Sequence, residues 1–156
     1  MNSELDGKIV LVTGGAGGIG SVISESFAEQ GAKVIVHYKH SKEKAEIIAK
    51  KIKGVAIYAD LTDSEQTKEL FDDIIDKEGK IDICIANAGK YPKDYAPLWE
   101  IGIERWNNTI STNLSLTYNT SRYFLKHVAE TKKGSLVLIG STAGIYGEAG
   151  HADYAA

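Results

Sequence analysis

Apolar residues gather in five short runs along the chain, which cover 8–13, 33–38, 55–59, 81–86 and 135–139. Most of these runs are nearly continuous, which is typical of strands that are covered on both faces. Between the runs, apolar residues recur with a helical period, so that strand and helix alternate along the chain. This order predicts an α/β fold in which right-handed crossovers build a doubly wound parallel sheet.

The helical period covers four segments, which are 18–30, 42–53, 64–77 and 104–130. Thr62 and Glu65 have the spacing of a capping box that would open the third helix. Gly31, Gly54 and Gly79 stand where the first three helices are expected to end. In the fourth helix, one stripe is expected to carry Trp106, Ile110, Leu114, Thr117, Ser121, Leu125 and Val128.

Composition adds little to this picture and excludes some classes of partner. A chain of 156 residues with 43% apolar content can bury a core, so we expect one domain over 1–156. Eighteen basic and 21 acidic side chains give a net charge of -3 without a long block of one sign. We therefore expect neither a nucleic-acid nor a membrane partner. A signal peptide and a long apolar stretch are both absent, which predicts a cytoplasmic location.

The side chains that often bind metals are also uninformative. Cys84 lies in an apolar run and is expected to be a small buried hydrophobe. The four histidines, His37, His40, His127 and His151, share no metal-ligand spacing, so no metal site is expected.

A glycine-rich turn joins the first predicted strand to the first predicted helix, where residues 13–20 read TGGAGGIG. Glycines in such a turn let a phosphate approach the backbone, and the following helix N-terminus attracts negative charge. In this strand-turn-helix context the turn indicates dinucleotide binding more than a purely structural role. Three spacings of dinucleotide-binding families fit it equally, so the turn alone does not choose a subfamily.

The second predicted strand ends in the sequence VHYKHS, residues 36–41, and contains no carboxylate to bind both ribose hydroxyls of NAD. Tyr38 and Lys39 are the candidates there, and Lys39 could pair with a 2′-phosphate. Lys39 could instead belong to the solvated lysine-rich face of the next helix. The missing acid favours NADP over NAD as the cofactor.

Further short motifs stand at the ends of the predicted elements. They are Thr13-Gly14-x-x-x-Gly18-Ile19-Gly20, Asp60-Leu61, Asn87-Ala88-Gly89, Asn113, and Ser141 followed 13 residues later by Tyr154-Ala155-Ala156. With these motifs the whole chain resembles the classical branch of the short-chain dehydrogenase/reductase family. The resemblance implies a Rossmann-like sheet with strand order 3-2-1-4-5, whose later strands and helices would follow residue 156.

The resemblance also implies roles that the residue patterns alone would not assign. Gly14, Gly18, Ile19 and Gly20 would hold the pyrophosphate. Asp60 would contact the adenine with Leu61 beside it, and Asn87, Ala88 and Gly89 would support the nicotinamide ribose. Without the resemblance, Asp60 and the Asn87 motif are ordinary turn residues.

Hydride transfer to a carbonyl needs a general acid beside the carbonyl oxygen, and the resemblance assigns this role to Tyr154. Ser141 would orient the substrate oxygen, and Asn113 would hold a water that relays protons. A tyrosine phenol is rarely ionised near neutral pH, and the family lowers its pKa with a lysine four residues later. Residue 158 lies beyond this chain. We therefore expect these 156 residues to be inactive and prone to aggregation, or to be part of a longer protein.

Two functions from different classes remain open. The first is an NAD(P)-dependent oxidoreductase for a small carbonyl or alcohol, because 36–46 resembles 3-oxoacyl-carrier-protein reductases and sugar dehydrogenases alike. In complete form it would be a homodimer or homotetramer that packs through the helix at 104–130. The second is a regulatory or scaffolding fragment that binds a dinucleotide without catalysis. Tyr91, Tyr95 and Trp99 form either a substrate entrance or a packed loop cluster.

Overall fold

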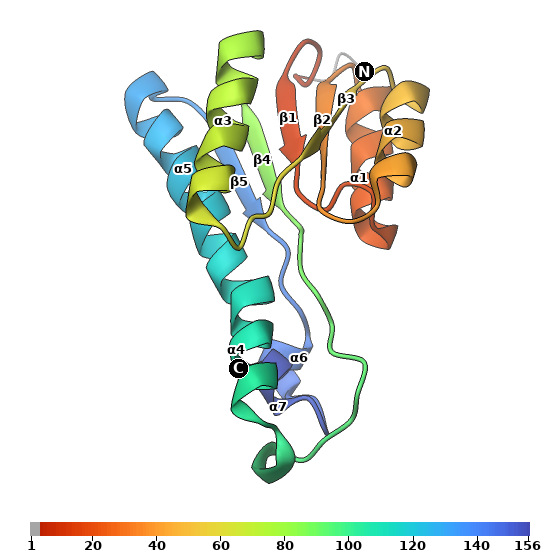
Figure 1. The fold of residues 1–156 in the computed structure, drawn as a ribbon. Coiled ribbons are helices and arrows are strands. Elements are labelled where there is room, and N and C mark those ends of the chain that lie inside the picture. Colours follow the sequence, from red (N-terminus) through yellow and green to blue (C-terminus); the bar gives the residue numbers. More distant parts are fainter. Residues whose placement is uncertain (1–3) are drawn as a thin grey trace.

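The computed structural model describes residues 4–156 and contains a five-stranded parallel sheet in the order β3-β2-β1-β4-β5 (Figure 1). The strands are β1 (Ile9–Val12), β2 (Lys33–Tyr38), β3 (Val55–Tyr58), β4 (Ile83–Ala86) and β5 (Ser135–Leu138). Each strand lies inside one of the predicted apolar runs. The predicted fold class and strand order are therefore confirmed.

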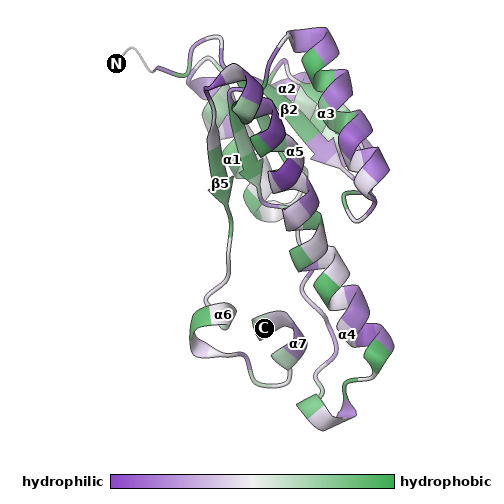
Figure 2. Cartoon of the chain, turned by 90° about the vertical axis from the view of Figure 1, so that its left-hand side faces the viewer, coloured by the Kyte–Doolittle hydropathy of each residue, from purple (hydrophilic) through white to green (hydrophobic). Residues whose placement is uncertain are grey.

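Helices cover both faces of the sheet, which explains the nearly continuous apolar runs. One face carries α1 (Gly18–Glu29) and α2 (Lys42–Lys51), and the other carries α3 (Ser64–Glu78) and α5 (Leu116–Thr131). In β1, Ile9 and Leu11 pack with the core under α3 and α5, while Val10 and Val12 pack with the core under α1 and α2. Figure 2 shows the strands as apolar and the helices as mixed in character. Cys84 is fully buried in β4, as expected.

Two helix ends differ from the sequence prediction. The residue that caps α3 is Asp63, whose carboxylate accepts hydrogen bonds from the backbone N–H groups of Glu65 and Gln66. Thr62 bonds the side chain of Asp60 instead, so the cap lies one residue later than predicted. After α2 the left-handed conformation falls on Lys53 and not on Gly54.

The predicted helix at 104–130 is three segments on one axis. They are α4 (Ile103–Ile110), a π-helical turn at Ser111–Ser115 and α5, preceded by the short 3-10 turn Leu98–Glu100. Side chains compete for backbone carbonyls there: Thr112 donates to Asn108, and Asn113 donates to Thr109. Such bonds disturb the regular ladder and are a physical reason for the wider turn.

The stripe expected on this helix is only partly buried, because five of its seven residues are half-buried and two are exposed. Leu114 and Leu125 are exposed, whereas Leu116, Thr120, Phe124 and His127 are buried. The buried side chains lie one position before those of the expected stripe, and Thr109 shows that this offset is already present before the π turn.

Beyond the carboxyl ends of the strands lie two four-residue helices, α6 (Ala143–Tyr146) and α7 (Ala152–Ala155), of which α7 packs between α4 and α6 (Figures 1 and 2). Long connections from β4 and β5 lead into this region. None of the helices within 4–156 has both the length and the apolar character needed to cross a membrane.

Candidate functional site

A cavity of about 800 Å³ lies at the carboxyl ends of the first four strands and reaches the helix that runs from α4 to α5. In open α/β sheets, this edge is where ligands bind. All eleven residues that the sequence nominated for cofactor contacts line the cavity, and they are Gly14, Gly18, Ile19, Gly20, Tyr38, Lys39, Asp60, Leu61, Asn87, Ala88 and Gly89. They come from four separate loops, so only the fold brings them together.

The glycine-rich turn forms one wall of the cavity. Gly14 has a φ of 61°, and a Cβ on Gly20 would collide with the carbonyl oxygen of Gly14. A Cβ on Gly18, in contrast, would meet no atom within 4 Å. The turn itself therefore requires Gly14 and Gly20, whereas Gly18 leaves open space at the wall.

Helix α1 begins at Gly18, and no side chain in the described part of the molecule caps its N-terminus. The first N–H groups of a helix have no acceptor within the helix, and the helix dipole makes this end attractive to anions. An uncapped N-terminus beside open space is suited to a phosphate group.

Thr13 joins the glycine-rich turn to the loop after β4. Its buried hydroxyl oxygen accepts hydrogen bonds from the backbone N–H groups of Asn87 and Ala88, both at 2.9 Å. In return, the Asn87 side-chain amide donates to the carbonyl oxygen of Thr13 at 2.9 Å. Two walls of the cavity are therefore held together by reciprocal bonds.

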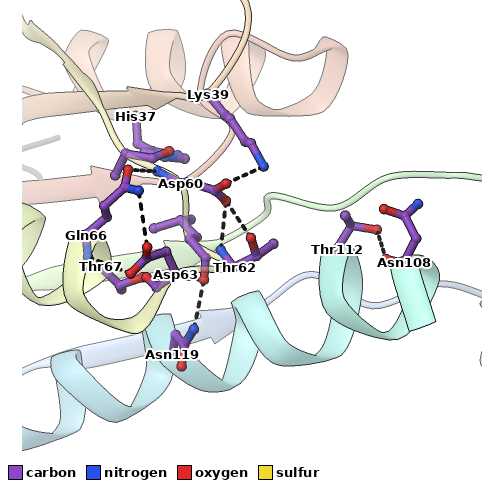
Figure 3. A network of polar contacts seen from close by, with 12 residues as sticks. His37, Lys39, Asp60, Thr62, Asp63, Gln66, Thr67, Asn108, Thr112 and Asn119 are labelled. Atoms are coloured by element: carbon purple, nitrogen blue, oxygen red, sulfur yellow. Dashed lines mark hydrogen bonds and ion pairs between the residues drawn. The ribbon is translucent and has the colours of Figure 1, made fainter. Parts of the chain in front are cut away.

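The loop after β3 forms a third wall, shown in Figure 3. One carboxylate oxygen of Asp60 accepts from the backbone and hydroxyl of Thr62, and the other lies 2.6 Å from the Lys39 ammonium. Burial raises the pKa of Asp60, but the bonds from Lys39 and Thr62 outweigh it and hold that pKa below its ordinary value. Lys39 is thus neither a free cation nor part of a solvated helix face, because it is paired across the cavity with Asp60.

Leu61 lies next to Asp60 and is almost fully buried. Its carbonyl oxygen accepts a hydrogen bond of 3.0 Å from the Asn119 side chain of α5. The loop after β3 is therefore anchored to a helix as well as to β2.

His37 lies beneath these walls, in β2, with 2% of its surface exposed. Its Nδ1 accepts a hydrogen bond from the N–H of Gly14 at 3.1 Å, and its Nε2 lies 3.0 Å from the carbonyl oxygen of Ala59. Burial lowers the pKa of His37 to about 4, although the Ala59 bond and the charge of Asp60 act in the opposite direction. The imidazole is therefore neutral near pH 7.

None of the three candidate catalytic residues is among the lining residues of this cavity, although Asn113 bonds Lys90, which lines it. Asn113, in the π turn, uses both ends of its amide on Lys90: its oxygen accepts from the Lys90 N–H at 2.9 Å, and its nitrogen donates to the Lys90 carbonyl at 3.0 Å. Asn113 therefore tethers the segment that follows Gly89 to the helix.

Ser141 is exposed, and its hydroxyl oxygen accepts a bond from the Ala143 N–H at 3.2 Å. Tyr154 is half-buried in α7, edge-on to the ring of Tyr91 with 5.0 Å between centroids. Tyr91 also stacks on His151, and its hydroxyl lies 3.1 Å from His151 Nδ1. Tyr91 and Tyr95 thus both contact the ring of His151, but Tyr95 and Trp99 are largely exposed.

Asp153, next to Tyr154, is fixed by an ion pair that the sequence did not reveal. Arg105 of α4 donates from Nε and Nη2 to its two carboxylate oxygens at 2.9 and 3.0 Å, and Thr109 adds a bond of 2.8 Å. The Asp153 carboxylate has no exposed surface. These bonds outweigh burial and keep the pKa of Asp153 below its ordinary value. They hold α7 against α4.

Sequence reasoning named Thr13 only as part of the glycine-rich motif and did not single out His37 or Arg105 as contributors to this region. A polar residue inside a buried apolar strand was the one available signal for His37. Arg105 offered none, because its partner lies 48 residues later. Over residues 4–156, no group of three or more His, Cys, Asp or Glu side chains is arranged to hold a metal ion.

Known proteins resemble this chain over nearly its whole length. The family model for short chain dehydrogenases matches residues 8–156. A 3-oxoacyl-[acyl-carrier-protein] reductase of Thermotoga maritima is 35% identical, over 98% of this chain and 63% of that protein. The NADP-dependent mannitol dehydrogenase of Alternaria alternata is 37% identical, over 90% of this chain and 55% of the relative.

The versicolorin reductase 1 of Aspergillus parasiticus is 35% identical and is covered over 59% of its length, with 98% of this chain aligned. The chain therefore spans about three fifths of the length of these curated relatives. The family model, the parallel sheet and the glycine-rich turn agree, and the chain belongs to the short chain dehydrogenase family.

Proposed function

We propose that the chain is the dinucleotide-binding part of an NAD(P)-dependent oxidoreductase, which transfers a hydride between a nicotinamide cofactor and a small carbonyl or alcohol. The observation that carries this proposal is the cavity of about 800 Å³ that all eleven nominated cofactor residues line. A nicotinamide dinucleotide supplies the hydride chemistry when bound. The chain's own residues bind the cofactor, orient the substrate and exchange protons with it.

The residues of the cavity fit such a cofactor. The open space at Gly18 and the uncapped start of α1 suit the pyrophosphate. Asp60 and Leu61 are proposed for the adenine end, and Asn87, Ala88 and Gly89, on the opposite wall, for the nicotinamide ribose. Tyr154 is proposed as the general acid, with Ser141 beside the substrate oxygen and Asn113 as a helper in proton transfer.

NADP is the proposed preferred cofactor. Lys39 stands at the end of β2, where the acid that would bind the ribose hydroxyls of NAD is absent. An ammonium group has three N–H donors, so Lys39 can retain Asp60 while it donates to a 2′-phosphate. The name of the mannitol dehydrogenase relative includes NADP dependence, which supports the same preference.

The proposed substrates follow the relatives' names, which include a 3-oxoacyl carrier protein and mannitol. We propose either a 3-oxoacyl thioester, which the enzyme reduces, or a sugar alcohol and its ketose, which it interconverts, and a homodimer or homotetramer in the cytoplasm.

Calorimetric titration of the 156-residue chain with NADP+ and NAD+ tests the cofactor site. Wild type is expected to bind NADP+ more tightly than NAD+. Lys39→Ser should weaken NADP+ binding by about 10- to 100-fold, because a charge-assisted hydrogen bond contributes about 1.5–3 kcal/mol. NAD+ binding should change little. Equal losses for both cofactors would refute the 2′-phosphate assignment.

NADPH oxidation with a panel of 3-oxoacyl thioesters and ketoses tests the reaction. A polypeptide that includes residue 158 is expected to turn over at least one class. Binding of the dinucleotide without turnover of any compound in the panel would refute the oxidoreductase proposal. It would favour the alternative, a dinucleotide-binding protein without catalysis.

A further inference from the structure

His37 joins two walls of the cavity from below. Its Nδ1 faces the N–H of Gly14 in the glycine-rich turn, and its Nε2 faces the carbonyl oxygen of Ala59, one residue before Asp60. The backbone carbonyl of His37 also accepts a bond from Gly15 at 3.0 Å. One residue of β2 thus holds two residues of the turn and the end of β3.

The partners of the ring define its protonation state. A backbone N–H can only donate, so Nδ1 must carry no proton, and a carbonyl can only accept, so Nε2 must carry one. A single neutral tautomer satisfies both bonds. The imidazolium form would place an N–H of the ring against the N–H of Gly14.

We propose that His37 is a positioning residue of the cofactor site, whose neutral Nε2-protonated ring clamps Gly14 to Ala59 and thereby sets the spacing between the pyrophosphate and adenine subsites. The inference rests on the proposed function, because it concerns how the dinucleotide is held. It adds a residue that contacts the backbone of both subsites and lines the cavity between them.

The geometry explains why the clamp matters for binding. Gly14 adopts a φ of 61°, and a Cβ added to it would lie only 3.1 Å from the Cα of Ala88, so the turn has little room to move on that side. On the other side, Gly14 is held by the hydrogen bond from its N–H to Nδ1 of His37. A dinucleotide spans both subsites at once, so its affinity depends on their separation.

A matched pair of variants separates the acceptor from the volume of the side chain. His37→Asn keeps a side-chain oxygen close to the place of Nδ1, whereas His37→Leu has a similar shape and no acceptor. We expect His37→Leu to bind NADP+ about tenfold more weakly than His37→Asn, because one buried backbone donor loses its partner. Equal NADP+ affinities in the two folded variants would overturn the inference.

His127 provides the control for a general loss of stability. It is also buried, its Nε2 accepts a bond of 3.2 Å from the Ile81 N–H, and it is not among the lining residues of the cavity. His127→Leu should lower the thermal midpoint as His37→Leu does and leave NADP+ affinity unchanged. A similar loss of affinity in both leucine variants would show that His37 acts only through stability.

Nitrogen NMR of the wild-type imidazole tests the clamp without any variant or ligand. Near pH 7 the His37 ring should show one protonated nitrogen, Nε2, and the Nδ1-protonated tautomer would overturn the inference. If His37→Leu does not fold, this measurement and the comparison of NADP+ affinity between His37→Asn and wild type test the inference. Wild type that binds neither dinucleotide would defeat the proposed function and the inference together, whereas tight binding that is insensitive to His37 would defeat the inference alone.

Discussion

Acidification should destabilise this protein through His37 before its carboxylates respond. The ordinary pKa of histidine is 6.5, and burial in β2 lowers the pKa of His37 to about 4. Above pH 6.5 the ring is neutral in both the folded and unfolded chain, so its contribution to stability is fully present. As the pH falls from 6.5 to about 4, the unfolded chain binds a proton that the folded chain excludes, and stability is lost.

The size of this effect follows from the same two values. At about 1.4 kcal/mol for each pH unit, the interval from 6.5 to about 4 amounts to a loss of about 3.5 kcal/mol. Small domains are stable by only about 5–15 kcal/mol, so the loss is large. The group facing the ring is Asp60, itself paired with Lys39, and its charge slightly favours the protonated ring.

Urea unfolding followed by circular dichroism, near pH 7 and near pH 4.5, measures this loss. The variant His37→Asn carries no titratable ring and should lose about 2–3 kcal/mol less than wild type over the same interval. The pKa values of Asp60, Asp82 and Asp153 lie below their ordinary value, so their own loss of stability falls mainly at lower pH. Parallel losses in wild type and His37→Asn would refute the reasoning, as would a His37 resonance that titrates near its ordinary value.

Three other substitutions test separate parts of the site. Gly18→Ala should leave the thermal midpoint unchanged or slightly raised, because the added Cβ meets no atom within 4 Å. The same variant should weaken NADP+ binding. Gly20→Ala should lower the free energy of unfolding by about 1–3 kcal/mol through overpacking. A lower thermal midpoint for Gly18→Ala than for Gly20→Ala would contradict the geometry of the turn. Thr13→Val keeps the side-chain shape but leaves the Ala88 N–H without its acceptor, whereas the Asn87 N–H retains the carbonyl oxygen of Ile85, for a loss of about 1–3 kcal/mol in urea unfolding. Asp153→Asn should break the bidentate pair with Arg105 and increase hydrogen exchange in α7 much more than in the sheet, and unchanged exchange there would show that the pair does not hold the helix.

The residues of the glycine-rich turn show what local sequence can predict. Their spacing, placed between an apolar run and a helical period, is enough to indicate a phosphate-binding turn. Which glycines the turn itself requires is a different question. Gly20 is required by the carbonyl of Gly14, and Gly18 is not, because steric contacts depend on the folded path of the backbone.

The long helix shows where periodicity fails. The period of apolar residues predicts one helix over 104–130, and the helix exists, but a π turn at Ser111–Ser115 interrupts it and the buried side chains lie one position before those of the expected stripe. Side chains that compete for backbone carbonyls favour this turn, and a simple apolar period cannot register them.

The sequence by itself determined the strand and helix order, the doubly wound class and the glycine-rich turn, because these depend on local periodicity and spacing. Asp60, Leu61 and the Asn87-Ala88-Gly89 motif were nominated only through the family resemblance, and the fold brings them to the same cavity as the turn. Only the tertiary structure decided the partners of Lys39, His37 and Arg105. Each of these side chains bonds a group on a different element, such as Asp60 for Lys39 and Asp153 for Arg105. Such pairings depend on which chain segments the sheet brings side by side, and this information is spread over the whole fold.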